Sequence, residues 1–328
     1  MHRFLIRRIT FGAAIVVLGA FITYAVLRLI PVSYVQTQAL RLSQFPGSKS
    51  YQDWIDQLNA MYGFDLSIPA GFLRWAGNAV RGDFGDSWAY TVPVVDHFKA
   101  VIMFSVVLQV VTLVIELVIA IPLGITAARK QYSKTDIGVT VAALMGISLP
   151  SFFFATVLRY VFAVRLGWFD VYGIVGRNHI FLNAWGKILD YANHLVLPAA
   201  TLMIMSIGGL MRYTRTIMLE VLNADYIRTA RAKGLPERIV INRHAFRNTM
   251  IPIVSYFSYL LPAMFSGFMI TETIFSIPGI GYAGYNAIVQ GDIPFTMFYM
   301  TFIILLTQVS LIIADMMYAV VDPRVRVN

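Results

Sequence analysis

The 328-residue chain contains no cysteine, and only 13% of its residues are charged. The lack of cysteine excludes disulfide bonds, thiolate metal ligands and a cysteine nucleophile. The sequence also lacks a GxxxxGK[ST] phosphate-binding loop and a HExxH pair, which excludes the usual ATPase and zinc-hydrolase motifs. A soluble domain of this length would carry far more charge on its surface. The composition therefore indicates a multi-span membrane protein, and the sequence shows no ATPase or zinc-hydrolase motif of its own.

Hydrophobic residues make up 58% of the chain and gather in long apolar runs. A helix of about 20 apolar residues crosses a hydrocarbon core about 30 Å thick. We therefore predict an all-α polytopic membrane protein with a kink at Pro150 in its third span, because proline removes a backbone hydrogen bond. The six transmembrane helices are predicted at Ile9–Leu27, Val101–Ala128, Ile137–Leu158, Leu195–Met211, Thr249–Thr271 and Ile293–Val321.

The spans divide the chain into three parts. Residues 1–30 hold the N-terminus and the first helix, whose apolar run is longer than the core of a cleavable signal peptide. Residues 31–100 form a polar, aromatic extracytoplasmic segment in which Gln52–Tyr62 and Ala70–Val80 read as short amphipathic helices. Residues 101–328 form a five-helix core with a cytoplasmic loop at 212–251.

The distribution of positive charge predicts the orientation of the chain. Most of its 26 lysine and arginine residues fall in the N-terminus, the C-terminal tail and two inter-span loops, whereas the longer outer segments hold fewer. Cytoplasmic segments of membrane proteins carry such an excess of basic residues, so both termini are expected inside. The formal charge of +9 is thus explained by topology, and no nucleic-acid partner is predicted.

The longest soluble-looking run in the second half is Glu220–Pro252, which apolar spans enclose on both sides. Asn223 is placed to cap a short helix, and Gly234 is placed to end it in the left-handed conformation. Leu235-Pro236 then starts a second helix, because proline fits a first turn. Small residues at Ala230, Ala232 and Gly234 would let a partner surface approach the first helix closely. A solvated basic loop and a nucleic-acid-binding helix-turn-helix are the alternatives.

The residues of this loop resemble a known family. YIRTARAKGL followed by HAFRNTMIP is similar to the coupling loop in the permeases of ATP-binding-cassette (ABC) importers for dipeptides, oligopeptides and nickel. The order FLRWAGNAVRGDFGDSW resembles the outer segment of the B-type, first-named permease of that family. ETIFSIPGIG, ADMMYA and the terminal DPR extend the resemblance over nearly the whole chain.

The resemblance implies that the loop docks on a cytoplasmic ATPase. The contact then maps onto Asp225, Tyr226, Arg228, Thr229, Ala230, Arg231, Ala232, Lys233, Gly234 and Leu235. It also implies a non-catalytic subunit with no cofactor of its own, since ATP and Mg²⁺ would bind to partner subunits. The partners implied are a second homologous permease, one or two ABC ATPases, an extracytoplasmic substrate-binding protein and the lipid bilayer. The implied location is the plasma (inner) membrane of a bacterium or archaeon.

The implied substrates are di- or oligopeptides, with oligosaccharides or nickel chelates as alternatives. A self-sufficient secondary transporter is the alternative from another class, in which intramembrane acids would carry protons or ions. That function predicts an inverted repeat, which the sequence does not show. We name five possible gate or pathway residues, which are Glu116, Tyr259, Phe265, Glu272 and Asp315.

Two of these acids have specific expected partners. Glu272 lies beside the SIPGIG turn, where it would either form an outer gate or accept hydrogen bonds from the backbone amides of the turn. Asp315 lies among apolar residues near the inner end of the sixth span and should find a cation. Arg212 and Arg215, at the end of the fourth span, are the candidates by topology.

Overall fold

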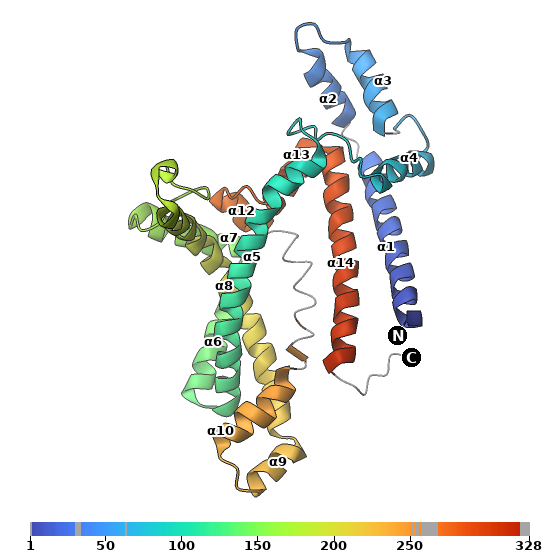
Figure 1. The fold of residues 1–328 in the computed structure, drawn as a ribbon. Helices are drawn as coiled ribbons and strands as arrows, with labels where there is room; N and C mark the ends of the chain where they lie inside the picture. The colour runs from blue at the N-terminus through green and yellow to red at the C-terminus, as the bar shows by residue number, and fades with distance from the viewer. Residues whose placement is uncertain are drawn as a thin grey trace. The chain divides into compact units, whose positions relative to one another are not determined.

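The computed structural model describes residues 2–29, 34–62, 64–250, 252–253, 256 and 268–321 (Figure 1). All regular elements in these residues are helices, apart from one isolated bridge between Asp86 and Pro93. The prediction of a helical polytopic membrane protein is therefore confirmed. The helices fall into two units, one from Met1–Met103 and Ala283–Ile312 and the other from Phe104–Tyr282 and Ile313–Arg326. The two units are described separately.

Four helices in the described ranges are long and apolar enough to cross a membrane, and a bent pair makes a fifth candidate. The count of six spans is not established, because most of the predicted span Thr249–Thr271 lies outside the described residues. The sixth predicted span has the bounds of α14. The four candidate spans are Ile6–Leu29, Val94–Arg129, Ala184–Leu222 and Ile293–Ile313.

The first unit combines a helix pair with the short helices of residues 34–80. Helix α1 (His2–Leu29) approaches α14 (Ile293–Val321) closely at Gly19, where an added Cβ would lie 2.8 Å from the Ile304 side chain. The predicted short helices are confirmed as α3 (Tyr51–Tyr62) and α4 (Ile68–Val80). Helix α2 (Tyr34–Ser43) was not predicted. One apolar cluster joins these elements, formed by Ala20, Tyr24, Val35, Ala39, Leu58, Phe72, Trp88, Ile293 and Met297.

The second unit is built around two long helices. Helix α5 (Val94–Arg129) enters it at Phe104, and α8 (Ala184–Leu222) runs through it. Both begin before the predicted spans, because a run of apolar residues marks only the part of a helix that fits the hydrocarbon. The side chain of Asn183 caps α8 by accepting a hydrogen bond from the Gly186 amide at 2.7 Å.

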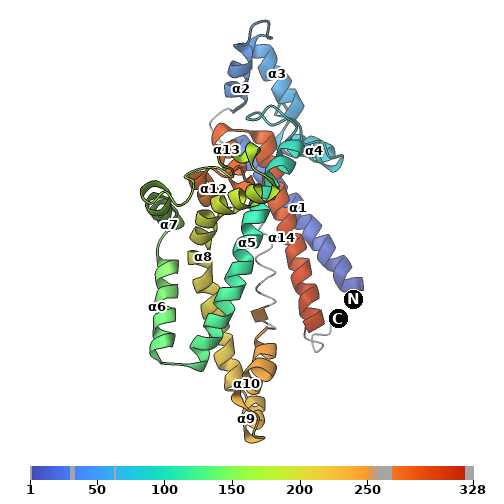
Figure 2. The same ribbon diagram turned by 60° about the vertical axis from the view of Figure 1, so that its left-hand side comes forward.

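The third predicted span is broken more sharply than expected. Helix α6 (Lys134–Ser148) ends before Pro150, and α7 (Ser151–Leu158) with the π-helical turn η1 (Arg159–Arg165) leaves at 98° to it. Figure 2 shows the turn between α6 and α7. We predicted one kinked helix, but Pro150 instead precedes the first residue of a new helix, where its missing N–H costs nothing.

Helix α6 packs along α8 through small residues. A Cβ added at Gly208 would lie 2.6 Å from the Ala143 carbonyl oxygen. Gly124 of α5 approaches α8 as closely, because a Cβ added there would lie 2.6 Å from the Met211 carbonyl oxygen. Small residues let two helix backbones approach closely. Lipid tails are as apolar as helix side chains, so helices in a membrane associate through such close packing and not through the hydrophobic effect. The three helices form the frame of the second unit.

An ion pair also joins α6 to α8. Arg215 donates from Nε to Asp136 Oδ1 at 2.7 Å and from Nη2 to Oδ2 at 2.8 Å. The carboxylate also accepts hydrogen bonds from the Tyr132 amide and the Thr140 hydroxyl. The side chains of Asp136 and Arg215 are 5% and 23% exposed. Arg215, a candidate partner for Asp315, is thus engaged by Asp136.

We expect Asp136→Asn to lower the free energy of unfolding in detergent by about 3 kcal/mol, because it leaves a mostly buried guanidinium without its counter-charge. The matched control is Asp56→Asn, which alters an exposed acid of α3 and should change stability by less than about 0.5 kcal/mol. Unfolding by denaturing detergent, followed by circular dichroism, measures both. A loss in Asp136→Asn no larger than in the control would contradict a structural role for the pair.

Candidate functional site

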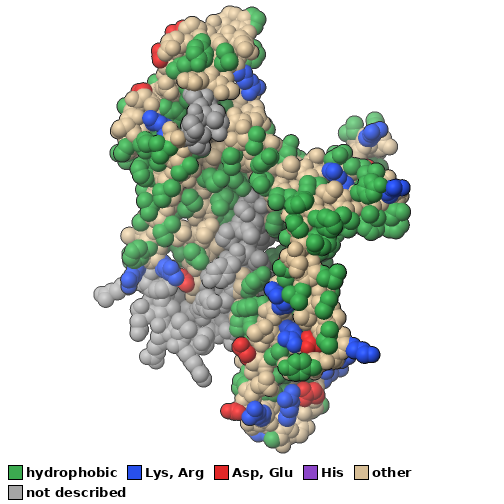
Figure 3. Space-filling view, turned by 180° about the vertical axis from the view of Figure 1, so that it is seen from behind, with side chains coloured by type: hydrophobic (Ala, Val, Ile, Leu, Met, Phe, Trp, Pro, Cys, Tyr) green, Lys and Arg blue, Asp and Glu red, His purple; other side chains and the backbone are tan. Residues whose placement is uncertain are grey.

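The predicted coupling residues lie on a short helix that follows α8. Helix α9 (Asp225–Ala232) is followed by α10 (Glu237–Ile239) and the π-helical turn η3 (Val240–Ala245) (Figure 1). Figure 3 shows that charged side chains gather at this end of the second unit, whereas hydrophobic side chains cover much of the helices above it. The predicted helix-turn-helix is confirmed.

A hydrophobic cluster fixes α9 to its neighbours. We call it the loop core, and it contains buried residues from α5, α8, α9 and η3. Ile227 of α9 is fully buried in it, beside Met218 of α8. Burying such a side chain stabilises the packed state by about 1.5–3 kcal/mol. The loop core consists of Ala128, Met218, Ile227, Ala230, Val240, Ile241 and Ala245.

The ends of α9 differ in how well the sequence predicted them. Gly234 has φ +75° and ends the helix as expected, with its amide bound to the Arg231 carbonyl at 2.9 Å. The prediction of Asn223 as the N-cap was wrong, because Asn223 closes α8 and its side chain donates back to the Leu219 carbonyl. The N-cap residue of α9 is Ala224, which has no side-chain cap.

The expectation for Ala230 also needs correction. Ala230 is 6% exposed and packs within the loop core, so its small side chain serves internal packing and is not available to a partner. Leu235 is half-buried beside the same cluster. The remaining predicted coupling residues form the exposed face of α9 and its C-terminal turn, which we call the α9 face. It contains Asp225, Tyr226, Arg228, Thr229, Arg231, Ala232, Lys233 and Gly234.

A salt bridge closes the turn between α9 and α10. Arg231 donates from Nε and Nη2 to the Glu237 carboxylate, at 3.1 and 2.8 Å. These hydrogen bonds lower the pKa of Glu237 below its ordinary value. A lowered pKa keeps the carboxylate charged at neutral pH, and the contribution of the pair is lost only as pH falls through that pKa. Both side chains are about half exposed, so the pair orients the turn and adds little stability.

Glu272 forms a second polar site in the same unit. It is fully buried in the middle of the seven-residue helix α12 (Met269–Phe275). Its Oε1 accepts hydrogen bonds from the Ser105 hydroxyl at 2.6 Å and the Phe268 amide at 3.3 Å, and its Oε2 accepts one from the Tyr282 amide at 2.8 Å. The Ser105 hydroxyl also accepts a hydrogen bond from the Ile280 amide at 2.8 Å. This one carboxylate therefore binds α5, the residue before α12 and the first turn of α13 (Ile280–Gln290).

The glycines in and after this turn leave room for neighbouring side chains. Gly279 lies in the turn, where an added Cβ would lie 2.5 Å from Glu272 Cδ and from Ser105 Oγ. Gly281, the last residue of the SIPGIG sequence, and Gly284 both belong to α13. A Cβ at Gly281 would come within 3.0 Å of Glu272 Oε2. The glycines leave room for the buried carboxylate, a reason that no turn motif reveals.

The other predicted pathway residues are not brought together in the described part of the chain. Glu116 is 4% exposed within α5, and its Oε1 has no hydrogen-bond partner there. Asp315 is half-buried in α14. Tyr259 and Phe265 lie outside the described residues.

Comparison with known proteins identifies the type of chain. Residues 120–327 match the family described as the inner membrane component of binding-protein-dependent transport systems. This match covers more than half of the chain and includes α9 and Glu272. The chain belongs to this family. It is therefore an inner-membrane permease subunit of an ABC transport system.

Similar permeases match most of the chain. The oligopeptide transport system permease protein AppB of Bacillus subtilis is 38% identical over 82% of this chain and 84% of its own. A protein of Brucella ovis named as a peptide permease is 33% identical over the full length of both chains. The peptidoglycan transport system permease protein YejB of Agrobacterium fabrum is 33% identical over 86% of this chain and 79% of its own.

In this permease we expect Gly279→Ala to lower the free energy of unfolding by about 1–3 kcal/mol, because the new methyl group would collide with a buried carboxylate. Gly138→Ala is the matched control, since Gly138 lies in α6 with open space around it. Alanine there should raise the helix stability by about 0.5–1 kcal/mol. Thermal unfolding in detergent compares the two, and equal stability of both variants would show that the Glu272 turn is not tightly packed.

Proposed function

We propose that this chain is one of two transmembrane subunits of an ATP-driven importer of short peptides, and that the α9 face docks on a cytoplasmic ATPase. The observation that supports this proposal is the contrast between the two sides of α9. Ile227 and Ala230 are buried in the loop core, whereas the opposite side exposes a basic surface. A loop that only linked two spans would need no such anchored helix.

The loop core suggests how movement of α9 would reach the membrane. It joins α9 to residues at the ends of α5 and α8, so a displaced α9 pulls on both helices. The Asp136–Arg215 pair joins α8 to α6 in turn. Packed cores transmit strain because they are dense and deform little. We infer that ATPase closure moves these three helices as a frame.

The partners follow from the same proposal. ATP and Mg²⁺ would be bound by the ATPases, and this subunit would perform no catalysis. A second permease would complete the path, and an extracytoplasmic binding protein would deliver the substrate. The α9 face and both termini would lie in the cytoplasm, as the positive charge of these segments favours.

A peptide substrate is supported by the names of the relatives that match most of the chain. Oligosaccharides and nickel chelates remain the alternative substrates. Tyr259 and Phe265 are proposed to line the path, and Glu116 and Asp315 to contribute polar groups to it. For Glu272 the hydrogen bonds favour a structural role, in which it keeps the turn before α13 in place.

We expect Ala232→Trp to uncouple ATP hydrolysis from transport, because an indole ring on the α9 face would hold the helix away from the ATPase. Ala230 is unsuitable for this test because it is buried. The control is Asn242→Trp, which places the same ring at an exposed position of η3, outside the α9 face. The assembled transporter is reconstituted in vesicles, and peptide uptake is measured together with ATP hydrolysis.

Uptake in Ala232→Trp should fall at least tenfold, while the amount of assembled permease stays within twofold of the parent. Normal peptide-stimulated ATPase activity and normal uptake in Ala232→Trp would contradict the assignment of the α9 face. An equal loss in Asn242→Trp would also contradict it.

A further inference from the structure

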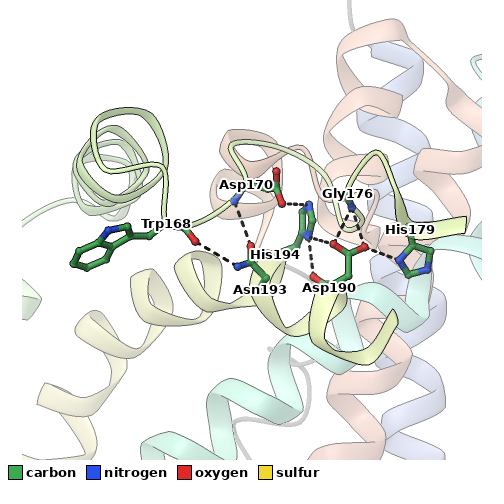
Figure 4. A network of polar contacts seen from close by, with 7 residues as sticks. All are labelled: Trp168, Asp170, Gly176, His179, Asp190, Asn193 and His194. Carbon is green, nitrogen blue, oxygen red and sulfur yellow. Dashed lines mark hydrogen bonds and ion pairs between the residues drawn. The ribbon is translucent and has the colours of Figure 1, made fainter. Parts of the chain in front are cut away.

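A cluster of ionisable residues lies where the loop between η1 and α8 meets α8, and it shares no residue with the α9 face or the Glu272 site. Asp170 comes from the loop, and Asp190 and His194 come from the first turns of α8 (Figure 4). One ligand atom from each of these three residues lies within 4.8 Å of the others. With both termini expected inside, the loop between the third and fourth predicted spans is expected on the outer side of the membrane. The proposed coupling function uses none of these residues.

The orientation of His194 leaves one ring nitrogen available. Nδ1 lies 2.8 Å from the backbone carbonyl oxygen of Asp190, which can only accept a hydrogen bond. Nδ1 therefore carries the proton and donates it, so Nε2 of a neutral ring holds a lone pair. The side chain is 2% exposed, and Nε2 has no hydrogen-bond partner among the described residues. Metal-binding histidines are oriented in this way, by a hydrogen bond from the other nitrogen.

The nearest polar group to this lone pair is a carboxylate. Nε2 of His194 lies 3.4 Å from Oδ2 of Asp170. With a neutral ring, both atoms are acceptors and repel one another unless a cation lies between them. Tetrahedral zinc with bonds of about 2.0–2.1 Å to nitrogen and oxygen separates these two ligand atoms by about 3.3 Å. The observed distance matches that separation.

Neighbouring groups hold the cluster in place. Both carboxylate oxygens of Asp190 accept hydrogen bonds from the Gly176 amide, at 3.1 and 3.0 Å. His179 Nδ1 contacts Asp190 Oδ2 at 2.5 Å. The Asp170 amide donates to Asn193 Oδ1 at 3.3 Å. Three residues thus hold Asp170 and Asp190, and the Asp190 carbonyl holds the imidazole, before any ion binds.

We propose that Asp170, Asp190 and His194 bind a divalent transition-metal ion of the zinc type. His194 Nε2 and the Asp170 carboxylate are the two ligands already at the right separation. The Asp190 carboxylate, whose Oδ1 lies 3.5 Å from His194 Nδ1, would turn toward the ion to become the third ligand. Imidazole with carboxylates is a ligand set that suits zinc. The Asp170 side chain is 57% exposed, so the ion can enter from solvent and retain water as its fourth ligand.

The ion would fasten the loop to α8. The same loop binds α12, because the Gly173 amide donates to the Phe275 carbonyl at 2.9 Å. Its side chains Phe169, Val171 and Ile174 pack against a buried cluster that also contains Phe275. A metal at Asp170 therefore links α8, the loop and the helix that carries Glu272. The site is structural, with no part in the coupling proposed above.

The test uses the purified full-length chain in detergent, treated with a chelator and then dialysed against ZnCl₂ or MgCl₂. We expect about one zinc per chain by elemental analysis, and a rise in the apparent melting temperature with zinc but not with magnesium. Asp170→Asn and His194→Gln should each weaken zinc binding at least tenfold. Asp56→Asn, which removes an exposed acid from α3, should bind zinc as the parent does.

Asp170 is largely exposed, so Asp170→Asn should fold even if the buried His194→Gln variant does not. The proposal would be overturned if the parent protein bound no zinc. It would also be overturned if Asp170→Asn bound zinc as tightly as the parent does. It would also be overturned if zinc had no effect and the parent were instead stabilised as the pH fell through the range in which histidine protonates. That result would assign the pair as a simple ion pair of His194 with Asp170. Neither readout depends on ATP or transport, so the outcome is independent of the proposed function.

Discussion

Polar groups that are withdrawn from water must find partners inside the protein, and this requirement accounts for much of the second unit. An unsatisfied buried donor or acceptor costs about 1–3 kcal/mol, and a buried charge costs more. The Glu272 carboxylate meets the requirement by accepting hydrogen bonds from three separate parts of the chain, and Asp136 meets it through Arg215. These two carboxylates fix the positions of helices that apolar packing alone would let slide.

Local signals in the sequence predicted the parts of the fold that depend on few residues. The bounds of α14 followed from the length of an apolar run, and the end of α9 followed from Gly234. Features that depend on distant residues were missed. Ser105 and Glu272 are 167 positions apart, and Asp136 and Arg215 are 79 apart, so no local pattern pairs them.

The small residues of this chain show that a motif can be recognised correctly while the reason for one of its residues is missed. Ala230 belongs to the loop motif that identifies the family, yet the described contacts explain its size by packing inside the loop core. Gly281 fits a turn motif, but it lies in a helix and leaves space for a carboxylate. A glycine or alanine in a sequence can be interpreted in two ways, because close internal packing and close approach of a partner both require a small side chain.

The right-angle break after α6 has a consequence for the lipid around the protein. The 15 residues of α6 rise only about 22 Å along their axis, which is shorter than a hydrocarbon core of about 30 Å. Because α7 leaves at 98°, it adds almost nothing to that height. Where α6 faces lipid, the bilayer must thin locally or another helix must cover the gap. If lipid is what α6 faces, this edge carries a hydrophobic mismatch and responds to membrane thickness.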